Sequence, residues 1–377
     1  MSHLDALLAP KPQRRLLALD GGGIRGLITI EILAAIEAAL RKNAGNEKLV
    51  LADWFDYVAG TSTGAIIACC ISLGMSIDQI RTFYRQQGAL MFQKAQIPRR
   101  FWWYKYRSDQ LAAALKNVIG ANETLGSDRV RTLLLLVMRN ATTDSHWPLS
   151  NNPGAIFNQG EGSNLSLPLW QLVRASTAAP VFFPPEKIAV VAGAPPFLFV
   201  DGGVTAFNNP AFLLFIMATI EPYKLQWPTG TDKMLLVSVG TGANADANAH
   251  LLPGAMNLIY NATKIPAALM YAALVQQDTL CRIYGQCRFG APLDLEIGDL
   301  RKTASPGGVP KAFAYCRYEP ELSAEGLSDL GLDDVPARNV QQMDSVAHMG
   351  DLSRLGKAYA AKYFLPAHFE GFLGFLD

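Results

Sequence analysis

Residues 16–26 read LLALDGGGIRG, and this short stretch decides how the rest of the chain is interpreted. Its apolar start predicts a buried strand that ends at Asp20, and the three glycines that follow predict a tight turn. Residues 27–40 are apolar at helical spacing, so a helix should begin directly after the turn. Glycines let backbone N–H groups approach a ligand, and the start of a helix adds partial positive charge. The stretch is therefore typical of a site that holds negative charge.

The composition favours a large globular protein without a general affinity for polyanions. The chain has 377 residues, of which 50% are hydrophobic, enough for one large α/β domain or for two domains. Its 33 Lys and Arg nearly balance its 32 Asp and Glu, so no binding to DNA or RNA polymers is expected. The absence of a CxxC pair favours a reduced cytosolic setting for the five cysteines, Cys69, Cys70, Cys281, Cys287 and Cys316.

The expected location follows from the N-terminus and from the apolar runs. Residues 1–15 lack the basic and apolar segments of a signal peptide. The longest apolar runs, residues 133–138 and 211–220, are shorter than the ~20 residues that span a bilayer. We therefore expect a cytoplasmic protein that acts peripherally on the inner face of the membrane.

Predicted strands and helices alternate along the first part of the chain. Buried strands are expected near residues 16–20, 57–60, 131–138, 197–200 and 233–239, and helices near residues 27–40, 65–73, 77–87, 108–120, 169–178 and 210–220. This alternation indicates a three-layer α/β/α fold with a mostly parallel central sheet, whose sites lie at the carboxyl ends of strands. We expect an N-terminal extension at 1–14, a core at 15–245, and a mainly helical elaboration at 246–377 that packs on the same domain and ends in one helix at 337–364.

The second motif, Gly60-Thr61-Ser62-Thr63-Gly64, lies between a predicted strand and a predicted helix. It fits G-x-S-x-G, the nucleophile elbow, in which a strained turn pushes a serine hydroxyl out of the sheet. Ser62 is therefore the candidate nucleophile. The alternative is an ordinary turn in which a serine or threonine caps the next helix.

A serine nucleophile needs a base, and histidine is the usual one. No predicted strand ends in a glycine motif beside any of the five histidines, His3, His146, His250, His348 and His368. Asp201 does end such a strand, in Asp201-Gly202-Gly203, and is the candidate base. A carboxylate with a pKa of ~3.9 is a weak base, but the general-base contribution is only ~10²–10⁴-fold, and amides of residues 21–25 would stabilise the oxyanion. An ordinary turn at Asp201 remains the alternative.

The opening loop also fits a rival motif. Gly21, Gly23 and Gly26 satisfy G-x-G-x-x-G, the dinucleotide fingerprint, and an acidic residue follows at a suitable distance as Glu47 or Asp53. A dinucleotide fold does not explain the motifs at residues 60–64 and 201–203, and a loop without lysine excludes a Walker A site. A dinucleotide-binding protein and a catalytically idle ligand receptor remain the alternatives to a hydrolase.

Taken in order, DGGGIRG, GTSTG and DGG resemble the patatin-like phospholipase family. Further segments agree, among them ASTAAP at 175–180, NNP at 208–210 and SVGTG at 238–242. The resemblance covers about residues 15–245. It implies a serine acyl hydrolase that cleaves fatty-acyl esters of membrane glycerophospholipids by a Ser–Asp dyad, with no metal and no organic cofactor.

Carried over residue by residue, the resemblance makes Ser62 the nucleophile and Asp201 the general base. The oxyanion hole would be formed by Gly21, Gly22, Gly23 and Arg25. The surrounding motifs would be supported by Gly60, Gly64, Gly202 and Gly203.

Bacterial members of similar length include anti-phage effectors that a cyclic oligonucleotide switches on. We hypothesise such an activator here, with a constitutive lipase as the alternative. Basic and aromatic side chains after residue 245 would pair with phosphates and stack on bases, and a packed interior is the other interpretation of the same residues. The proposed contacts are Arg282, Tyr284, Arg288 and Arg317.

The other expected partners are a phospholipid membrane surface, which carries the substrate, and a second copy of the chain in a homo-oligomer. Aromatic and basic groups suit the boundary between lipid headgroups and acyl chains. Residues 97–106 and 369–376 are the candidate membrane contacts, and buried packing is the alternative for both.

Overall fold

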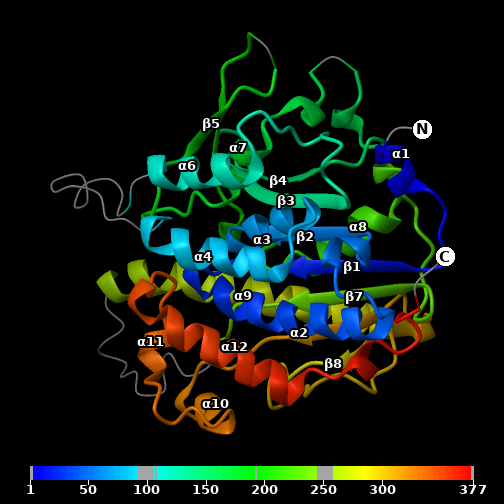
Figure 1. Cartoon of the computed structure of the whole chain (residues 1–377), viewed down its shortest axis with the longest axis vertical. Coiled ribbons are helices and arrows are strands. Elements are labelled where there is room, and N and C mark those ends of the chain that lie inside the picture. The colour runs from blue at the N-terminus through cyan, green and yellow to red at the C-terminus, as the bar shows by residue number, and fades with distance from the viewer. Residues whose placement is uncertain are drawn as a thin grey trace.

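The computed structural model describes residues 3–91, 106, 108–160, 162–191, 193–243 and 258–374. A mixed nine-stranded sheet lies at its centre, in the order β5-β6-β3-β2-β1-β7-β9-β8, and β4 pairs with β3 beside this path. Helices cover both faces of the sheet (Figure 1). The predicted three-layer α/β/α class is therefore confirmed.

The strands are β1 (Arg14–Leu19), β2 (Tyr57–Thr61), β3 (Leu133–Asn140), β4 (Ser145–Ser150), β5 (Glu186–Ile188), β6 (Phe197–Asp201), β7 (Met234–Val239), β8 (Gln286–Phe289) and β9 (Ala314–Tyr318). The α-helices are α1 (His3–Leu8), α2 (Gly26–Ala44), α3 (Thr63–Ser72), α4 (Ile77–Met91), α6 (Ser108–Ile119), α7 (Leu169–Ser176), α8 (Ala211–Thr219), α9 (Leu258–Tyr284), α10 (Ala324–Asp329), α11 (Ala337–Gln341) and α12 (Met349–Tyr363).

The central strands are apolar at nearly every position because both faces of the sheet are covered. Along β1, Leu17 and Leu19 face one core, which is completed by α2, α3, α4, α6, α7 and α12. Leu16 and Ala18 face a second core, which is completed by α8 and α9. A continuous apolar run, rather than alternation, is typical of such a strand.

Two strands meet end to end along one edge of β3. β2 runs parallel to β3, with Thr61 beside Val137, whereas β6 runs antiparallel, with Asp201 beside Met138. Because β4 occupies the other edge of β3, the carboxyl ends of β2 and β6 face each other on the same edge. The alternating pattern predicts a parallel strand at 197–200. The strand, β6, is instead antiparallel to β3. Its carboxyl end still lies beside the carboxyl end of β2, because β6 runs toward β2 from the opposite direction.

The C-terminal part is mainly helical, as expected, but it also extends the sheet. β9 pairs in parallel with β7, and β8 pairs with β9. On one face of the sheet, α12 lies alongside α2 (Figure 1). The single helix predicted at 337–364 is instead two helices, α11 and α12. In the break between them, the carbonyl oxygen of Met343 accepts a hydrogen bond from the N–H of Ile24 at 2.9 Å, so the backbone leaves the helix to reach the glycine loop.

The candidate membrane contacts lie partly in the interior. Phe369 and Phe372 are each 1% exposed and belong to the core, which removes them as membrane contacts. Residues 97–105 and 375–376 lie outside the described residues. In the part of the chain that is described, no helix combines the length and the apolar character needed to cross a bilayer.

We predict that Gly356→Ala destabilises the contact between α12 and α2. A Cβ atom at Gly356 would lie 2.8 Å from both the Cβ of Glu31 and the carbonyl oxygen of Ile28. Overpacking of this kind should lower the free energy of unfolding by about 1–3 kcal/mol, measured by urea denaturation. Gly350→Ala on the same helix is the control, since nothing lies within 4 Å of its Cβ position, and it should keep or slightly raise stability. Equal urea midpoints for the two variants would contradict the close approach of α12 to α2 at Gly356.

Candidate active site

Ser62 occupies the turn between β2 and α3. Its backbone has φ 55° and ψ −122°, which is rare for a residue with a side chain. Ser176, at the end of α7, holds this turn: its hydroxyl accepts the N–H of Ser62 at 3.0 Å and donates to the carbonyl oxygen of Val137 at 2.6 Å. A strained backbone held in this way is typical of functional sites, and it presents the Ser62 hydroxyl beyond the end of the sheet.

The glycines that flank Ser62 allow the surrounding backbones to touch. A Cβ atom at Gly64 would lie 2.2 Å from the carbonyl oxygen of Leu19 on β1, and one at Gly60 would lie 2.1 Å from the carbonyl oxygen of Gly64. The turn is therefore pressed against the end of β1. This brings the glycine loop beside the serine, since a Cβ atom at Gly21 would lie 3.1 Å from the Cβ of Ser62.

Ser62 Oγ donates a hydrogen bond to Asp201 Oδ2 at 2.6 Å. The other carboxylate oxygen, Oδ1, accepts the N–H of Gly203 at 2.7 Å, in the short helical turn Gly202–Val204. Both oxygens of Asp201 are thus engaged, and its carboxylate has one orientation. No hydrogen bond joins Ser62 or Asp201 to the histidines whose side chains are described, His146, His348 and His368.

Burial raises the pKa of Asp201 to about 6. The main cause is the loss of water around the carboxylate, which the hydrogen bonds from Ser62 and Gly203 and the charge of Arg174 oppose. A carboxylate with this pKa holds a proton more strongly than one in water, whose pKa is ~3.9, and yet it stays mostly ionised at neutral pH. Asp201 is therefore a stronger base than its residue type alone suggests.

Two amides of the glycine loop are available to a negatively charged oxygen. The N–H of Gly21 donates to the carbonyl oxygen of Asn208 at 3.2 Å, and that of Ile24 donates to Met343. Within the described residues, the N–H groups of Gly22 and Gly23 have no hydrogen-bond partner. The N–H of Gly21 is therefore already paired, because it holds the loop to Asn208, and the oxyanion role expected of Gly21 stays a prediction.

Arg25, the remaining residue of the predicted oxyanion loop, braces the loop with its side chain. Its guanidinium donates to the carbonyl oxygen of Gly22 at 3.5 Å and to that of Gln341 at 3.3 Å. The first contact is local, and the second joins the short turn Gly23–Arg25 to the C-terminal part of the chain.

The surroundings of the loop do not match a dinucleotide site. Such a ligand lies beyond the carboxyl ends of the strands, where an acidic residue must meet its ribose. Asp53 precedes β2 and pairs with Arg131, and Glu47 follows the end of α2. Both acids therefore lie toward the amino ends of the strands, opposite the loop.

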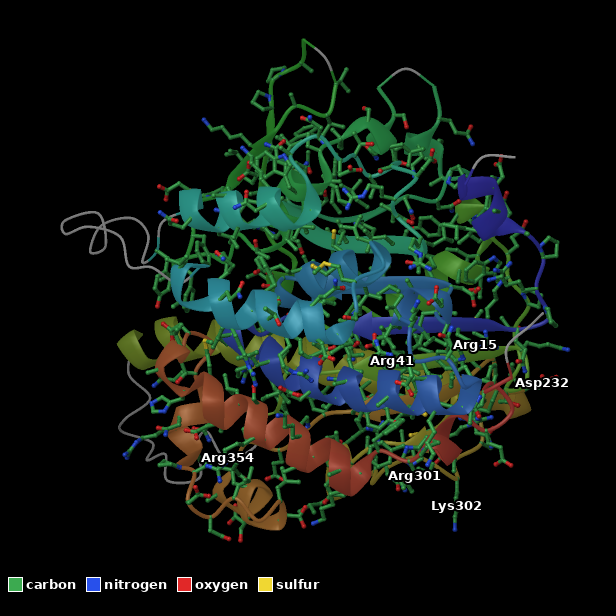
Figure 2. The ribbon with its side chains drawn as sticks, viewed as in Figure 1. Arg15, Arg41, Asp232, Arg301, Lys302 and Arg354 are labelled. Carbon is green, nitrogen blue, oxygen red and sulfur yellow. The ribbon has the colours of Figure 1, made fainter. Side chains whose placement is uncertain are left out.

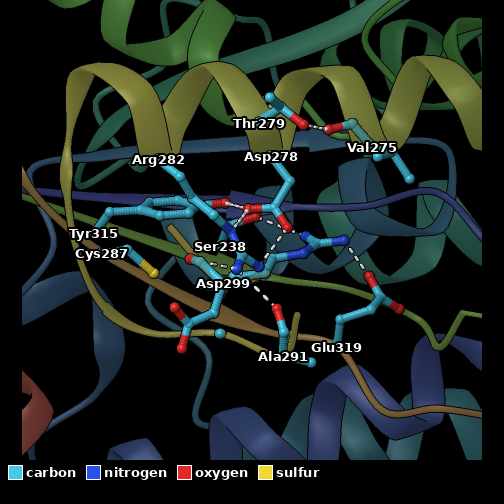
Figure 3. Close-up of polar contacts among 12 residues, drawn as sticks. Ser238, Val275, Asp278, Thr279, Arg282, Cys287, Ala291, Asp299, Tyr315 and Glu319 are labelled. Atoms are coloured by element: carbon cyan, nitrogen blue, oxygen red, sulfur yellow. Dashed lines mark hydrogen bonds and ion pairs between the residues drawn. The ribbon is translucent and has the colours of Figure 1, made fainter. Parts of the chain in front are cut away.

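The four residues proposed to contact a nucleotide do not form one surface. Arg282 and Arg317 are each 1% exposed. Arg282 is paired with buried Asp278 (Figure 3), and Arg317 is paired with buried Asp20. Arg288 donates to the carbonyl oxygen of Glu370 at 2.7 Å, and Tyr284 is 43% exposed. The interior positions of Arg282 and Arg317 do not support the predicted nucleotide contacts, because the carboxylates already occupy their guanidinium groups.

Other basic residues of the C-terminal part are at the surface. Arg301 and Lys302 are exposed and lie at the lower right of the molecule in Figure 2. Among the residues that are described, no three His, Cys, Asp or Glu side chains lie close enough together to hold a metal ion. All five cysteines are buried and unpaired.

Comparison with known proteins agrees with this geometry. The family model for patatin-like phospholipases matches residues 17–215. The chain belongs to the patatin-like phospholipase family. The match contains the glycine loop, the elbow and Asp201, so all three lie in the part of the chain that defines the family.

Several relatives are similar over part of their length. A cGAMP-activated phospholipase of Vibrio cholerae is 30% identical over 213 residues, which are 54% of this chain and 57% of that protein. Patatin group J-1 of Solanum tuberosum is 31% identical over 248 residues, 61% of each chain. The chain thus covers less than two thirds of these relatives. Among solved structures, human GIVD cytosolic phospholipase A2 aligns with 95% of this chain and 60% of its own, at 12% identity and a TM-score of 0.49.

Sequence reasoning missed the residues that hold the site from distant segments. Ser176 fixes the elbow, and Asn208 and Thr241 contact the backbone of Gly21. Each acts on a main-chain group of another segment, so no local spacing reveals it. One sequence feature could have identified them: these residues lie in the segments ASTAAP, NNP and SVGTG, which resemble the corresponding segments of the family.

We predict that Asp201→Asn makes the protein more stable at neutral pH. The folded state raises the carboxyl pKa from 3.8 to about 6, so folding favours the protonated form, and wild-type stability falls as the pH rises between these values. At ~1.4 kcal/mol per pKa unit, the free energy of unfolding of the variant should rise relative to that of wild type by on the order of 3 kcal/mol between pH ~4 and pH ~7. Urea denaturation of both proteins across this range tests the prediction, and a difference that does not change with pH would contradict it.

Proposed function

We propose that the protein is a serine acyl hydrolase that cleaves fatty-acyl esters of membrane glycerophospholipids, with Ser62 as nucleophile and Asp201 as general base. The observation that carries the proposal is the 2.6 Å hydrogen bond from Ser62 Oγ to Asp201 Oδ2, made by a strained serine beside a loop with two unpaired amides. Membership of the patatin-like phospholipase family supports the substrate class.

The first half of the reaction forms an acyl-serine. Asp201 accepts the proton of Ser62 Oγ while Oγ attacks the ester carbonyl carbon. The carbonyl oxygen becomes negatively charged and receives hydrogen bonds from the N–H groups of Gly22 and Gly23. When the tetrahedral intermediate collapses, the ester C–O bond breaks, and protonated Asp201 returns its proton to the departing alcohol, a lysophospholipid.

The second half releases the fatty acid. Asp201 takes a proton from water, and the hydroxide attacks the acyl carbon under the same two amides. The bond from this carbon to Ser62 Oγ then breaks, and Asp201 returns the proton to Oγ. A single carboxylate serves as base and as acid in each half, and a pKa of about 6 suits both roles near neutral pH. The net reaction consumes one ester and one water.

We predict that Ser62→Ala and Asp201→Asn each lower fatty-acid release from phospholipid vesicles by at least ~10³-fold while the protein stays folded. Ser166→Ala, at an exposed serine, is the matched control and should keep full activity. A fluorophosphonate should form an adduct at Ser62, detected by mass spectrometry of peptides. Full activity in either dyad variant would remove the proposed mechanism, and tight binding of NAD without an adduct would favour the dinucleotide alternative.

We also propose that a cyclic oligonucleotide raises this activity, as would suit an effector of anti-phage defence. The support is the likeness to the cGAMP-activated phospholipase of Vibrio cholerae. Vesicle hydrolysis measured with a panel of cyclic di- and trinucleotides tests the idea, with linear dinucleotides as controls. At least one cyclic compound should raise the rate at least ~10-fold, which corresponds to an activation free energy lower by ~1.4 kcal/mol. Equal rates throughout would leave a constitutive lipase.

A further inference from the structure

A buried cluster of three charged residues lies behind the glycine loop. Arg317 on β9 donates to Asp20 Oδ1 at 2.9 Å and to Asp20 Oδ2 at 2.6 Å. It also donates to Ser238 Oγ on β7 at 2.7 Å and to the carboxylate of Glu319. Asp20 and Arg317 are 0% and 1% exposed. The contact from Arg317 to Asp20 reaches across β7, which separates β9 from β1 in the sheet.

The arginine compensates two carboxylates that would otherwise be unfavourable in the interior. Burial raises the pKa of Asp20 and raises that of Glu319 to about 7, while the charge of Arg317 opposes both shifts. Removing one partner of a buried pair leaves an uncompensated charge and is strongly destabilising. Arg317 therefore favours the ionised form of Asp20, against the effect of burial, and fixes the carboxylate in place.

Arg317 holds the glycine loop directly through Asp20. Asp20 immediately precedes Gly21, and both of its carboxylate oxygens accept from the same guanidinium. A planar guanidinium that pairs with two oxygens fixes the direction of a carboxylate as well as its position. The first residue of the loop is therefore anchored at its side chain.

A second connection runs from Arg317 through Glu319 to the same loop. Glu319 Oε1 accepts the N–H of Gly242 at 2.6 Å, which fixes the turn that follows β7. In that turn, Thr241 Oγ1 donates to the carbonyl oxygen of Gly21 at 3.1 Å. Arg317 thus determines the position of both the side chain before the loop and the hydroxyl that contacts its first carbonyl group.

The contact from Thr241 sets the direction of one of the two available amides. The carbonyl group of Gly21 and the N–H of Gly22 belong to one planar trans peptide, so they point in opposite directions. With the oxygen held by Thr241, the N–H of Gly22 is turned away from Thr241. The fit is close, since a Cβ atom at Gly22 would lie 2.0 Å from Thr241 Oγ1.

We propose that Arg317 is a positioning residue for the reaction: through Asp20 and through Glu319 with Thr241, it holds the Gly22 amide in the direction that meets the oxyanion. The inference rests on the proposed hydrolase function. It assigns a part in catalysis to β9, which lies outside the residues 17–215 matched by the family model.

The test is Arg317→Lys, which keeps the charge but loses the planar group that spans Asp20, Ser238 and Glu319. We expect kcat for vesicle or soluble ester hydrolysis to fall about 10–100-fold, less than the ~10²–10³ lost with a whole oxyanion donor, while KM changes less than ~2-fold. The rate constant of fluorophosphonate labelling at Ser62 should fall in parallel, since the phosphonyl oxygen uses the same amides.

Arg282→Lys is the matched control. Arg282 is also 1% exposed and donates to both oxygens of a buried carboxylate, that of Asp278, at 2.9 Å and 2.7 Å, but it does not contact the glycine loop. This variant should lose comparable stability in urea and keep its kcat within ~2-fold of wild type. The comparison separates a general loss of stability from a misplaced amide.

Thr241→Val provides a second test that introduces no change of charge. It removes the hydroxyl that contacts Gly21 and should lower kcat at nearly constant KM even if Arg317→Lys does not fold. An unchanged kcat in folded Arg317→Lys would overturn the inference. If Arg317→Lys does not fold, an unchanged kcat in Thr241→Val would overturn it. In both cases the proposed hydrolase function would remain. If wild type neither hydrolyses esters nor labels at Ser62, the proposed function itself has failed.

Discussion

The hydrogen bond from Ser62 to Asp201 is the interaction on which the rest of the site depends, and it exists because two strands end at the same place. β2 and β6 approach each other along one edge of β3 from opposite directions, so their last residues meet. A serine that leaves one strand and a carboxylate that ends the other are then within 2.6 Å without a third residue between them. Because β2 and β6 both pair with β3, the sheet fixes the positions of Ser62 and Asp201 relative to each other.

Burial has opposite uses at the two carboxylates of the site. At Asp201 the lost hydration is only partly compensated, and the raised pKa makes the group a better base. At Asp20 burial also raises the pKa, but two hydrogen bonds from Arg317 hold the carboxylate, and the group serves as an anchor. A low-dielectric interior strengthens both effects, since neither water nor salt screens the charges there. In the proposed mechanism, the same environment would strengthen the hydrogen bonds from the Gly22 and Gly23 amides to a developing negative charge.

Much of the fold could be predicted because its signals are local. The apolar run at 16–19 and the glycine turn after it depend only on neighbouring residues, as does the elbow at 60–64. β8 and β9 were not predicted, since four or five residues carry too little periodicity to distinguish a strand from a loop. In β9 the pattern is further disturbed by Arg317, whose charge is unfavourable in a strand until its partner, 297 residues away in sequence, is known.

Local sequence patterns were enough to identify the three motifs on which the proposed chemistry rests: a serine in an elbow, an aspartate after a strand and a glycine loop each depend on local backbone geometry. How these motifs are arranged relative to one another is visible only in the folded chain. Within the described residues, the amides of Gly22 and Gly23 have no partner while that of Gly21 is used, and Arg317 is an internal anchor rather than a surface contact. The reason is physical: hydrogen bonding and burial depend on residues brought together from distant parts of the chain, and no local spacing encodes them.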